Sequence, residues 1–191
     1  MPSFCLFATP IGRCALVWRG ERIIGAQLPE PDEDTARRRL ARRFPQAGEA
    51  PPPAFVEAAI TDIVALLAGE ARDLAHLPVD LDAVPAFERR VYEVALSIPP
   101  GETMTYGAVA ARLGQPGAAR AVGVALGRNP VPIIVPCHRV LAAGGRTGGF
   151  SAEGGVETKL RLLTIEKART DASPGLFAAL PLVARPSRAA E

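Results

Sequence analysis

The stretch Ile133-Ile134-Val135-Pro136-Cys137-His138-Arg139-Val140 is the most informative part of this 191-residue chain. It holds one of three cysteines directly before one of two histidines. Apolar residues lead in and Val140 follows, a pattern that predicts a buried strand passing through a tight turn at Pro136. A thiol attacks as the thiolate, which needs a base or a cation nearby. The stretch therefore predicts a reactive cysteine held at the end of a rigid strand.

The composition predicts a soluble globular protein with one large domain or two small ones, since 48% of the residues are hydrophobic and 22% are charged. The net charge of +2 does not point to a partner, but the distribution of charge is uneven. Residues 101–150 contain five arginines, no lysine and a single glutamate. This excess of arginine fits contacts made by the planar guanidinium group or contacts to phosphate. It also fits an ordinary solvent-exposed face.

Cys5, Cys14 and Cys137 are scattered and contain no CxxC pair. We expect neither a disulfide framework nor a metal site, and a reducing cytoplasmic location. The N-terminus lacks the basic and apolar pattern of a signal peptide, and the apolar runs are too short to span a membrane. Since no coiled coil or large apolar patch is evident, the expected state is a monomer.

The first part of the chain predicts a small sheet with helices. Strands are expected at residues 4–8, 14–19, 23–28 and 77–81, helices at 30–43 and 54–69, and a Pro-rich surface loop at 45–53. A change in composition near residues 82–85 marks the expected domain boundary.

The second part predicts mostly helices, at residues 87–97, 106–113, 117–126 and 156–166, with a strand at 140–143. Thr103 or Thr105 is expected to cap the helix that starts at Tyr106. The two short helices at residues 106–113 and 117–126, joined by a short turn, predict a helix-turn-helix. The second of them is rich in small residues, which fits close approach to a flat ligand and equally fits tight internal packing. Residues 170–191 predict a flexible tail.

Several motifs in this second part, taken in order, resemble the C-terminal domain of O6-alkylguanine-DNA alkyltransferases, also called methylated-DNA–protein-cysteine methyltransferases. They are Ile98-Pro99-Pro100-Gly101-Glu102-Thr103, Thr105-Tyr106-Gly107, Ala119-Arg120-Ala121-Val122-Gly123, Asn129-Pro130, Pro132, Pro136-Cys137-His138-Arg139-Val140 and Gly148-Gly149-Phe150-Ser151. The resemblance implies an α+β protein. Residues 1–85 would form a ribonuclease-H-like α/β lobe, and residues 86–169 a helical, winged-helix-like domain that binds DNA and carries the reaction.

The resemblance implies direct-reversal DNA repair, in which Cys137 takes a methyl or larger alkyl group from guanine O6, with thymine O4 as a further possible donor. His138 would act on Cys137 through a water molecule, because neighbours on one strand point to opposite faces. Glu166 would orient His138, and Glu157 on the same helix is a competing candidate. Nothing suggests a cofactor or a second thiol that regenerates the cysteine, so each molecule would react once.

The lesion lies inside the duplex, so the nucleotide must be flipped out. The resemblance implies that Arg120 fills the vacated stack while small residues let the helix enter the minor groove. The residues expected to contact double-stranded DNA are Arg120, Thr105, Ala119, Ala121 and Gly123. A plain phosphate contact or a surface position is the alternative for Arg120.

The remaining site residues are also implied by the resemblance. Tyr106 would hydrogen-bond the departing guanine, and Asn129 would hold the turn between the recognition helix and the active-site strand. The expected pocket consists of Pro132, Val140, Gly148, Phe150 and Ser151, with the Val140 carbonyl accepting from the guanine amine. The chain departs from the common pattern at Phe150, where tyrosine is usual, and in the longer Ala152-Glu153-Gly154-Gly155 loop.

Other functions remain open at this point. A lesion sensor that flags alkylated bases for another pathway would share the DNA-binding motifs, but relatives of that type lack the cysteine. A thiol hydrolase would use Cys137 and His138 and leave the helix-turn-helix unexplained. A transcriptional regulator would need zinc and regulator domains for which the chain is too short.

Overall fold

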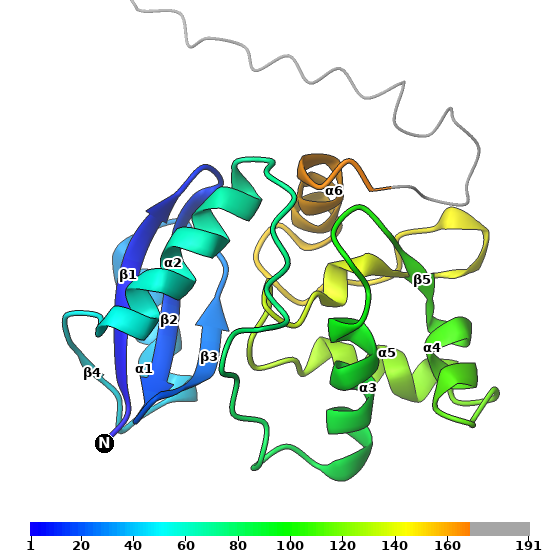
Figure 1. The fold of residues 1–191 in the computed structure, drawn as a ribbon, viewed down its shortest axis with the longest axis horizontal. Coiled ribbons are helices and arrows are strands. Elements are labelled where there is room, and N and C mark those ends of the chain that lie inside the picture. The colour runs from blue at the N-terminus through cyan, green and yellow to red at the C-terminus, as the bar shows by residue number, and fades with distance from the viewer. Residues whose placement is uncertain (169–191) are drawn as a thin grey trace, which may run out of the picture.

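The computed structural model describes residues 1–168, and the predicted tail at 170–191 lies outside the described residues. A sheet with two helices forms one side of the molecule, and a group of helices forms the other (Figure 1). The α+β class expected from the sequence is therefore confirmed.

The sheet consists of β1 (Ser3–Thr9), β2 (Gly12–Arg19), β3 (Arg22–Gln27) and β4 (Gly48–Glu49), in the order β3-β2-β1-β4. The first three strands are antiparallel, and β4 runs parallel to β1. Because side chains alternate along a strand, each face of the sheet has its own apolar layer. Helix α2 (Ala54–Leu67) covers the face that carries Cys5 and Leu16, and α1 (Glu33–Arg43) covers the face that carries Phe4 and Val17 (Figure 1).

Three expectations for this half need correction. The first helix starts at Glu33 rather than at residue 30, because Asp32 caps it by accepting a 2.7 Å hydrogen bond from the Thr35 amide. The Pro-rich loop at 45–53 includes the short strand β4. Residues 77–81 form no regular strand and contribute a single bridge between Val79 and Ile23.

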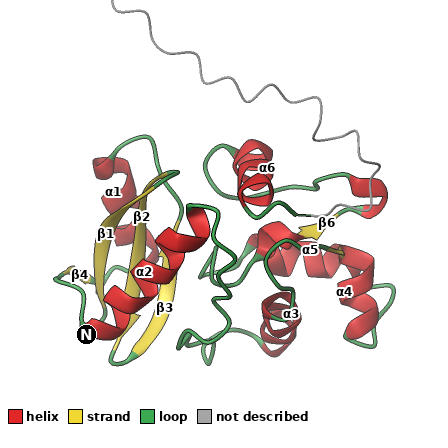
Figure 2. Ribbon diagram, turned by 45° about the horizontal axis from the view of Figure 1, so that its top comes forward, coloured by secondary structure: helices red, strands yellow, loops and turns green. Residues whose placement is uncertain are grey.

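The helical half contains α3 (Ala86–Leu96), α4 (Tyr106–Arg112), α5 (Ala119–Gly127) and α6 (Gly155–Ile165). Two short strands, β5 (Met104–Thr105) and β6 (Val140–Leu141), pair in parallel. Thr105 caps α4 by accepting from the Ala108 amide at 3.0 Å. Figure 2 shows α4 and α5 as neighbouring helices joined by a short loop, the arrangement expected of a helix-turn-helix.

The prediction of a strand through residues 133–137 is wrong. Ile133 has a φ of 76°, Pro132 bridges to Val135, and Cys137–Arg139 form a single 3₁₀ turn before β6. The Asn129 side chain holds this compact turn by donating to the Val135 carbonyl at 2.8 Å and accepting from the Val131 amide at 3.0 Å. These local bonds replace strand pairing. They also compensate for the energetic cost of the left-handed backbone conformation of Ile133, whose side chain is β-branched.

The two halves share one continuous core. A single cluster of buried apolar side chains includes Leu16 and Ile63 from the sheet half and Val91, Val122 and Val135 from the helical half. The Pro130 carbonyl accepts from the Ala26 amide at 2.9 Å, which ties β3 to the turn before Cys137. The predicted boundary at residues 82–85 stays a prediction.

Candidate active site

Cys137 lies where two cavities meet. Its side chain lines a hollow of about 560 Å³ beside α5 and a second cavity of about 230 Å³ beside the sheet half, although the residue is only 7% exposed. Burial raises the pKa of the Cys137 thiol, and the Asn129 side chain and the charge of Lys159 partly offset this effect. At neutral pH the group is therefore a thiol, and it needs a base to become a nucleophile.

His138 is turned away from the cavities toward a buried ion-pair network. Its Nε2 lies 2.9 Å from Glu166 Oε1, while Arg139 donates to both Glu166 oxygens at 2.9 and 2.8 Å. The side chains of all three residues are at most 3% exposed. The structure therefore places Glu166, and not the exposed Glu157, against the histidine. Burial opposes ionisation of Glu166, but hydrogen bonds from His138 and Arg139 outweigh it and lower its pKa to about 2.

The protonation state of His138 follows from these surroundings. Burial lowers its pKa despite the hydrogen bond to Glu166, so the imidazole is neutral at pH 7. An ionised Glu166 can only accept, which puts the proton on Nε2 and leaves the Nδ1 lone pair free. Nδ1 is buried and has no hydrogen-bond partner among residues 1–168. The imidazole is thus oriented as a base, with its accepting nitrogen on the side away from Glu166.

Lys159 is a functional candidate that our sequence reasoning did not identify. It is fully buried on α6, and its Nζ donates to the Val140 carbonyl at 2.6 Å. The same Nζ lies 5.6 Å from the centroid of the Tyr106 ring. Burial lowers the pKa of Lys159 to about 8. The available signal was its position on the apolar stripe of the last helix, where a lone lysine has to find a buried partner.

The larger cavity is bordered by α4, α5 and the loop before α6. Its lining includes Tyr106, Ala119, Arg120, Gly123 and Phe150. Arg120 is exposed at the first turn of α5, and within the described residues it has neither a hydrogen bond nor an ion pair. Ala121 borders a neighbouring surface hollow with Val124, which is 50% exposed. The exposed side of α5 is thus a face of small and apolar side chains with one free arginine.

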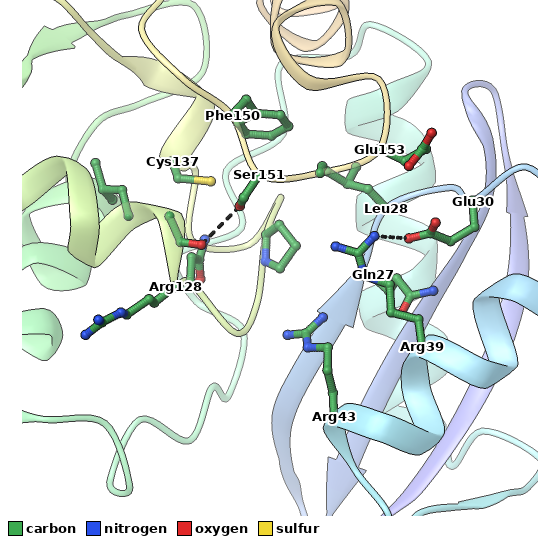
Figure 3. Close-up of a pocket in the computed structure, with 15 residues that line it drawn as sticks. Gln27, Leu28, Glu30, Arg39, Arg43, Arg128, Cys137, Phe150, Ser151 and Glu153 are labelled. Atoms are coloured by element: carbon green, nitrogen blue, oxygen red, sulfur yellow. Dashed lines mark hydrogen bonds and ion pairs between the residues drawn. The ribbon is translucent and has the colours of Figure 1, made fainter.

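The loop 148–155 closes the site from the other side. Ser151 donates to the Gly127 carbonyl at 3.0 Å, which links this loop to the end of α5 (Figure 3). Gly148 has a φ of 68°, and a Cβ at this position would lie 2.9 Å from the Tyr106 hydroxyl. Phe150 lines both cavities, while Pro132 lines only the smaller of the two. Ser151 also lines both, whereas Val140 and Gly148, the other two predicted pocket residues, line neither cavity.

The other cysteines do not share this environment. Cys5 and Cys14 are buried on β1 and β2, where burial raises their pKa values to about 11 and about 12. Among residues 1–168 no group of three or more His, Cys, Asp or Glu side chains is arranged to hold a metal ion. Within the same range, no helix is both long enough and apolar enough to cross a bilayer.

Comparisons with known proteins agree on one family. Residues 86–168 match the family model described as 6-O-methylguanine DNA methyltransferase, DNA binding domain. A methylated-DNA–protein-cysteine methyltransferase of Mycobacterium tuberculosis is 38% identical over 170 residues, which is 88% of this chain and 94% of the relative. The crystal structure of a Mycobacterium tuberculosis O6-methylguanine methyltransferase superposes with a TM-score of 0.73 at 36% identity, covering 93% of this chain and 99% of that one. A Mycobacterium tuberculosis OGT crystallised in complex with DNA has a TM-score of 0.72 at 35% identity, with 86% and 92% of the two chains covered.

Proposed function

Because the chain belongs to the methylated-DNA–protein-cysteine methyltransferase family, and repairs O6-methylguanine in DNA by methyl transfer to a cysteine, we propose that the accepting atom is the Sγ of Cys137. The observation that carries this assignment is the position of Cys137 at the junction of two cavities, one residue before a histidine that is held as a neutral base. Cys5 and Cys14 lie on β1 and β2 and line neither of these cavities, which supports the same choice.

The thiol proton leaves through a relay. A water molecule between Sγ and the free Nδ1 of His138 takes the thiol proton and passes one to the imidazole. Glu166 stabilises the imidazolium that forms, and Arg139 keeps Glu166 ionised and in place. The thiolate then attacks the methyl carbon, so the S–C bond forms as the C–O6 bond breaks and its electron pair stays on guanine.

The departing guanine needs a proton or a strong hydrogen bond. The Tyr106 hydroxyl lies beside Gly148 at the cavity wall and is the donor in this proposal. Burial raises the pKa of Tyr106, and the Lys159 cation 5.6 Å from its ring favours partial charge on the phenol oxygen. The Val140 carbonyl, already bonded to Lys159, keeps a second lone pair for the guanine amine.

The partner in this proposal is double-stranded DNA that carries an alkylated base. The small residues on the exposed side of α5 allow it to approach a groove closely, and Arg120 is free to enter the stack from which the nucleotide is flipped. The chain acts as a monomer in the cytoplasm, where its three free cysteines remain reduced. In this proposal thymine O4 is a second alkyl donor.

The test is an intact-mass measurement after the protein is mixed with excess duplex containing O6-methylguanine. The expected result is a gain of one methyl group per chain, located on Cys137 by peptide mapping, with no further turnover. The Cys137→Ser variant should bind the same duplex without gaining mass, and Cys14→Ala serves as the matched control that should react normally. Methylation elsewhere would refute the assignment, binding without any mass gain would favour the sensor, and continued turnover would favour a hydrolase.

A further inference from the structure

The smaller cavity is a second space that opens onto Cys137 from the side of the sheet half. It shares Cys137, Phe150 and Ser151 with the larger cavity, so the two spaces adjoin at the thiol. Its opposite wall comes from β3 and α1 of the N-terminal half. Figure 3 shows Cys137 and Ser151 on one side, with Gln27, Arg39 and Arg43 facing them across the space.

This opposite wall contains a buried hydrogen-bonding group without a partner. Gln27 is only 4% exposed, and its Nε2 donates to the Ala36 carbonyl at 3.3 Å. That bond leaves Oε1 directed elsewhere, and within the described part of the chain Oε1 has no hydrogen-bond donor. A buried acceptor without a donor is unfavourable. Gln27 lines this cavity, so an occupant that donates a hydrogen bond would supply the missing partner when the Gln27 amide turns toward it.

The same wall carries a positive charge without a counter-charge. Arg39 is paired with Glu30 at 2.6 Å. Arg43 donates instead to two backbone carbonyls, of Ala26 at 3.2 Å and of Pro130 at 3.1 Å, and no carboxylate among residues 1–168 pairs with it. Two of its five N–H groups are used in this way, so donors remain for a ligand. Figure 3 shows the Arg43 guanidinium directed from α1 into the space between the two walls.

We propose that this cavity receives the far end of O6 substituents that are longer than methyl and end in a polar group. The proposal rests on the proposed function, with the guanine in the larger cavity and its O6 substituent directed at Cys137. Arg43 donates to the terminal oxygen of the substituent, and Gln27 Oε1 accepts from a terminal N–H or O–H. A carboxamide end satisfies both residues, a carboxylate end satisfies Arg43 alone, and a branched alkyl end satisfies neither.

The reaction itself is unchanged by the length of the substituent. The Cys137 thiolate forms its S–C bond with the carbon attached to O6, the C–O6 bond breaks, and its electron pair remains on guanine, which takes up a proton. The polar end does not react. Its contacts act on the rate by holding the substituent in one orientation, so that the attacked carbon stays in line with Sγ.

The experiment compares four duplexes that each carry one modified guanine. The substituents are methyl, 3-carboxypropyl, 3-carbamoylpropyl and 4-methylpentyl, of which the last three have the same number of heavy atoms and nearly the same shape. Single-turnover rate constants are measured for each. In the wild-type protein we expect both polar-ended substrates to react at least about tenfold faster than the 4-methylpentyl substrate, the factor that one charge-assisted hydrogen bond supplies.

Two variants separate the roles of the two residues. Arg43→Met should remove the advantage of the carboxylate and reduce that of the carboxamide, while Gln27→Leu should reduce the advantage of the carboxamide and leave that of the carboxylate. Arg42→Met, the adjacent exposed arginine on α1 that does not line the cavity, is the control for the change in net charge. The rate with O6-methylguanine should stay within about twofold in all three variants.

Equal rates for the three long substituents in the wild-type protein would overturn the inference, as would equal effects of Arg42→Met and Arg43→Met. If Gln27→Leu folds poorly, which its melting temperature shows, Gln27→Glu replaces it. The added carboxylate should then slow the 3-carboxypropyl substrate selectively, and no selective slowing would also overturn the inference. The methyl substrate separates the role of Cys137 as the methyl acceptor from the binding of long substituents in the smaller cavity. If wild-type protein fails to transfer methyl to Cys137, the proposed function is refuted, whereas the results with the long substituents test only the smaller cavity.

Discussion

The Nζ of Lys159 donates a 2.6 Å hydrogen bond to the carbonyl oxygen of Val140, and the lysine side chain has no contact with solvent. The bond joins α6 to β6, directly after the reactive turn. It also fixes a cation 5.6 Å from the Tyr106 ring and close enough to Cys137 to oppose the rise in the pKa of the thiol. A buried lysine is costly to maintain, and this one faces the groups on which charge changes during transfer.

The first prediction concerns this cation. Lys159→Met preserves the length and apolar character of the side chain and removes its charge, so we expect methyl transfer to slow by at least about tenfold. Lys167→Met is the matched control, because Lys167 is exposed two residues after the end of the same helix. Single-turnover rates with O6-methylguanine duplex measure both variants. Equal rates for Lys159→Met and the wild type would show that the lysine is only a structural element.

The second prediction concerns stability and pH. Burial lowers the pKa of Lys159 from 10.5 to about 8 in the folded protein. Between these values the unfolded chain binds more protons than the folded one, so the wild type should gain stability relative to Lys159→Met as the pH rises from 8 to 10.5. At about 1.4 kcal/mol per pH unit the gain is roughly 3 kcal/mol. Urea unfolding of both proteins at several pH values measures it, and a gap that does not change with pH would contradict the prediction.

The third prediction concerns the buried network behind His138. Glu166→Gln leaves the Arg139 guanidinium buried without a carboxylate, and we expect a loss of about 3–5 kcal/mol in the free energy of unfolding. Transfer should also slow, because no anion stabilises the His138 imidazolium. The double variant Glu166→Gln, Arg139→Met removes the unpaired charge, so it should regain much of the stability but not the rate. If stability and rate recover together, the network has no role beyond folding.

The fourth prediction concerns the loop beside Tyr106. In Gly148→Ala the new Cβ would lie 2.9 Å from the Tyr106 hydroxyl, at a φ of 68° that itself costs about 1–2 kcal/mol for alanine. We expect the tyrosine to be displaced and transfer to be slowed. Gly149→Ala is the matched control, because nothing lies within 4 Å of its added Cβ. The ratio of the two transfer rates is the measurement, and a ratio near one would mean that the tyrosine position does not matter.

The fifth prediction concerns the free arginine on α5. Arg120→Ala should slow repair of O6-methylguanine in duplex DNA much more than reaction with free O6-benzylguanine, because only the duplex substrate requires base flipping. Arg38→Ala, exposed on α1, controls for the loss of one positive charge. Duplex binding should also weaken as salt rises, since phosphate contacts release counterions. Equal losses with both substrates would mean that Arg120 does not replace the flipped base.

Most of the regular elements could be predicted from the sequence. The strands around Leu16 and the helix around Ile63 follow from alternation and from helical spacing, which are local properties of the chain. The segment 133–137 was predicted wrongly, because four apolar residues in a row fit a strand and a buried turn equally well. What selects the turn is the Asn129 side chain, and its bond to the Val135 carbonyl spans six residues.

The order of the motifs alone was sufficient to identify the family and to predict Cys137 as the accepting residue, because residue identity and spacing are read directly along the chain. The partners of the site depend on contacts between distant residues, which no local pattern encodes. His138 meets Glu166 across 28 positions, Lys159 reaches Val140 across 19, and Gln27 and Arg43 reach the Cys137 cavity from the other half of the molecule. Burial then sets the charge of these groups, and burial exists only once the chain has folded.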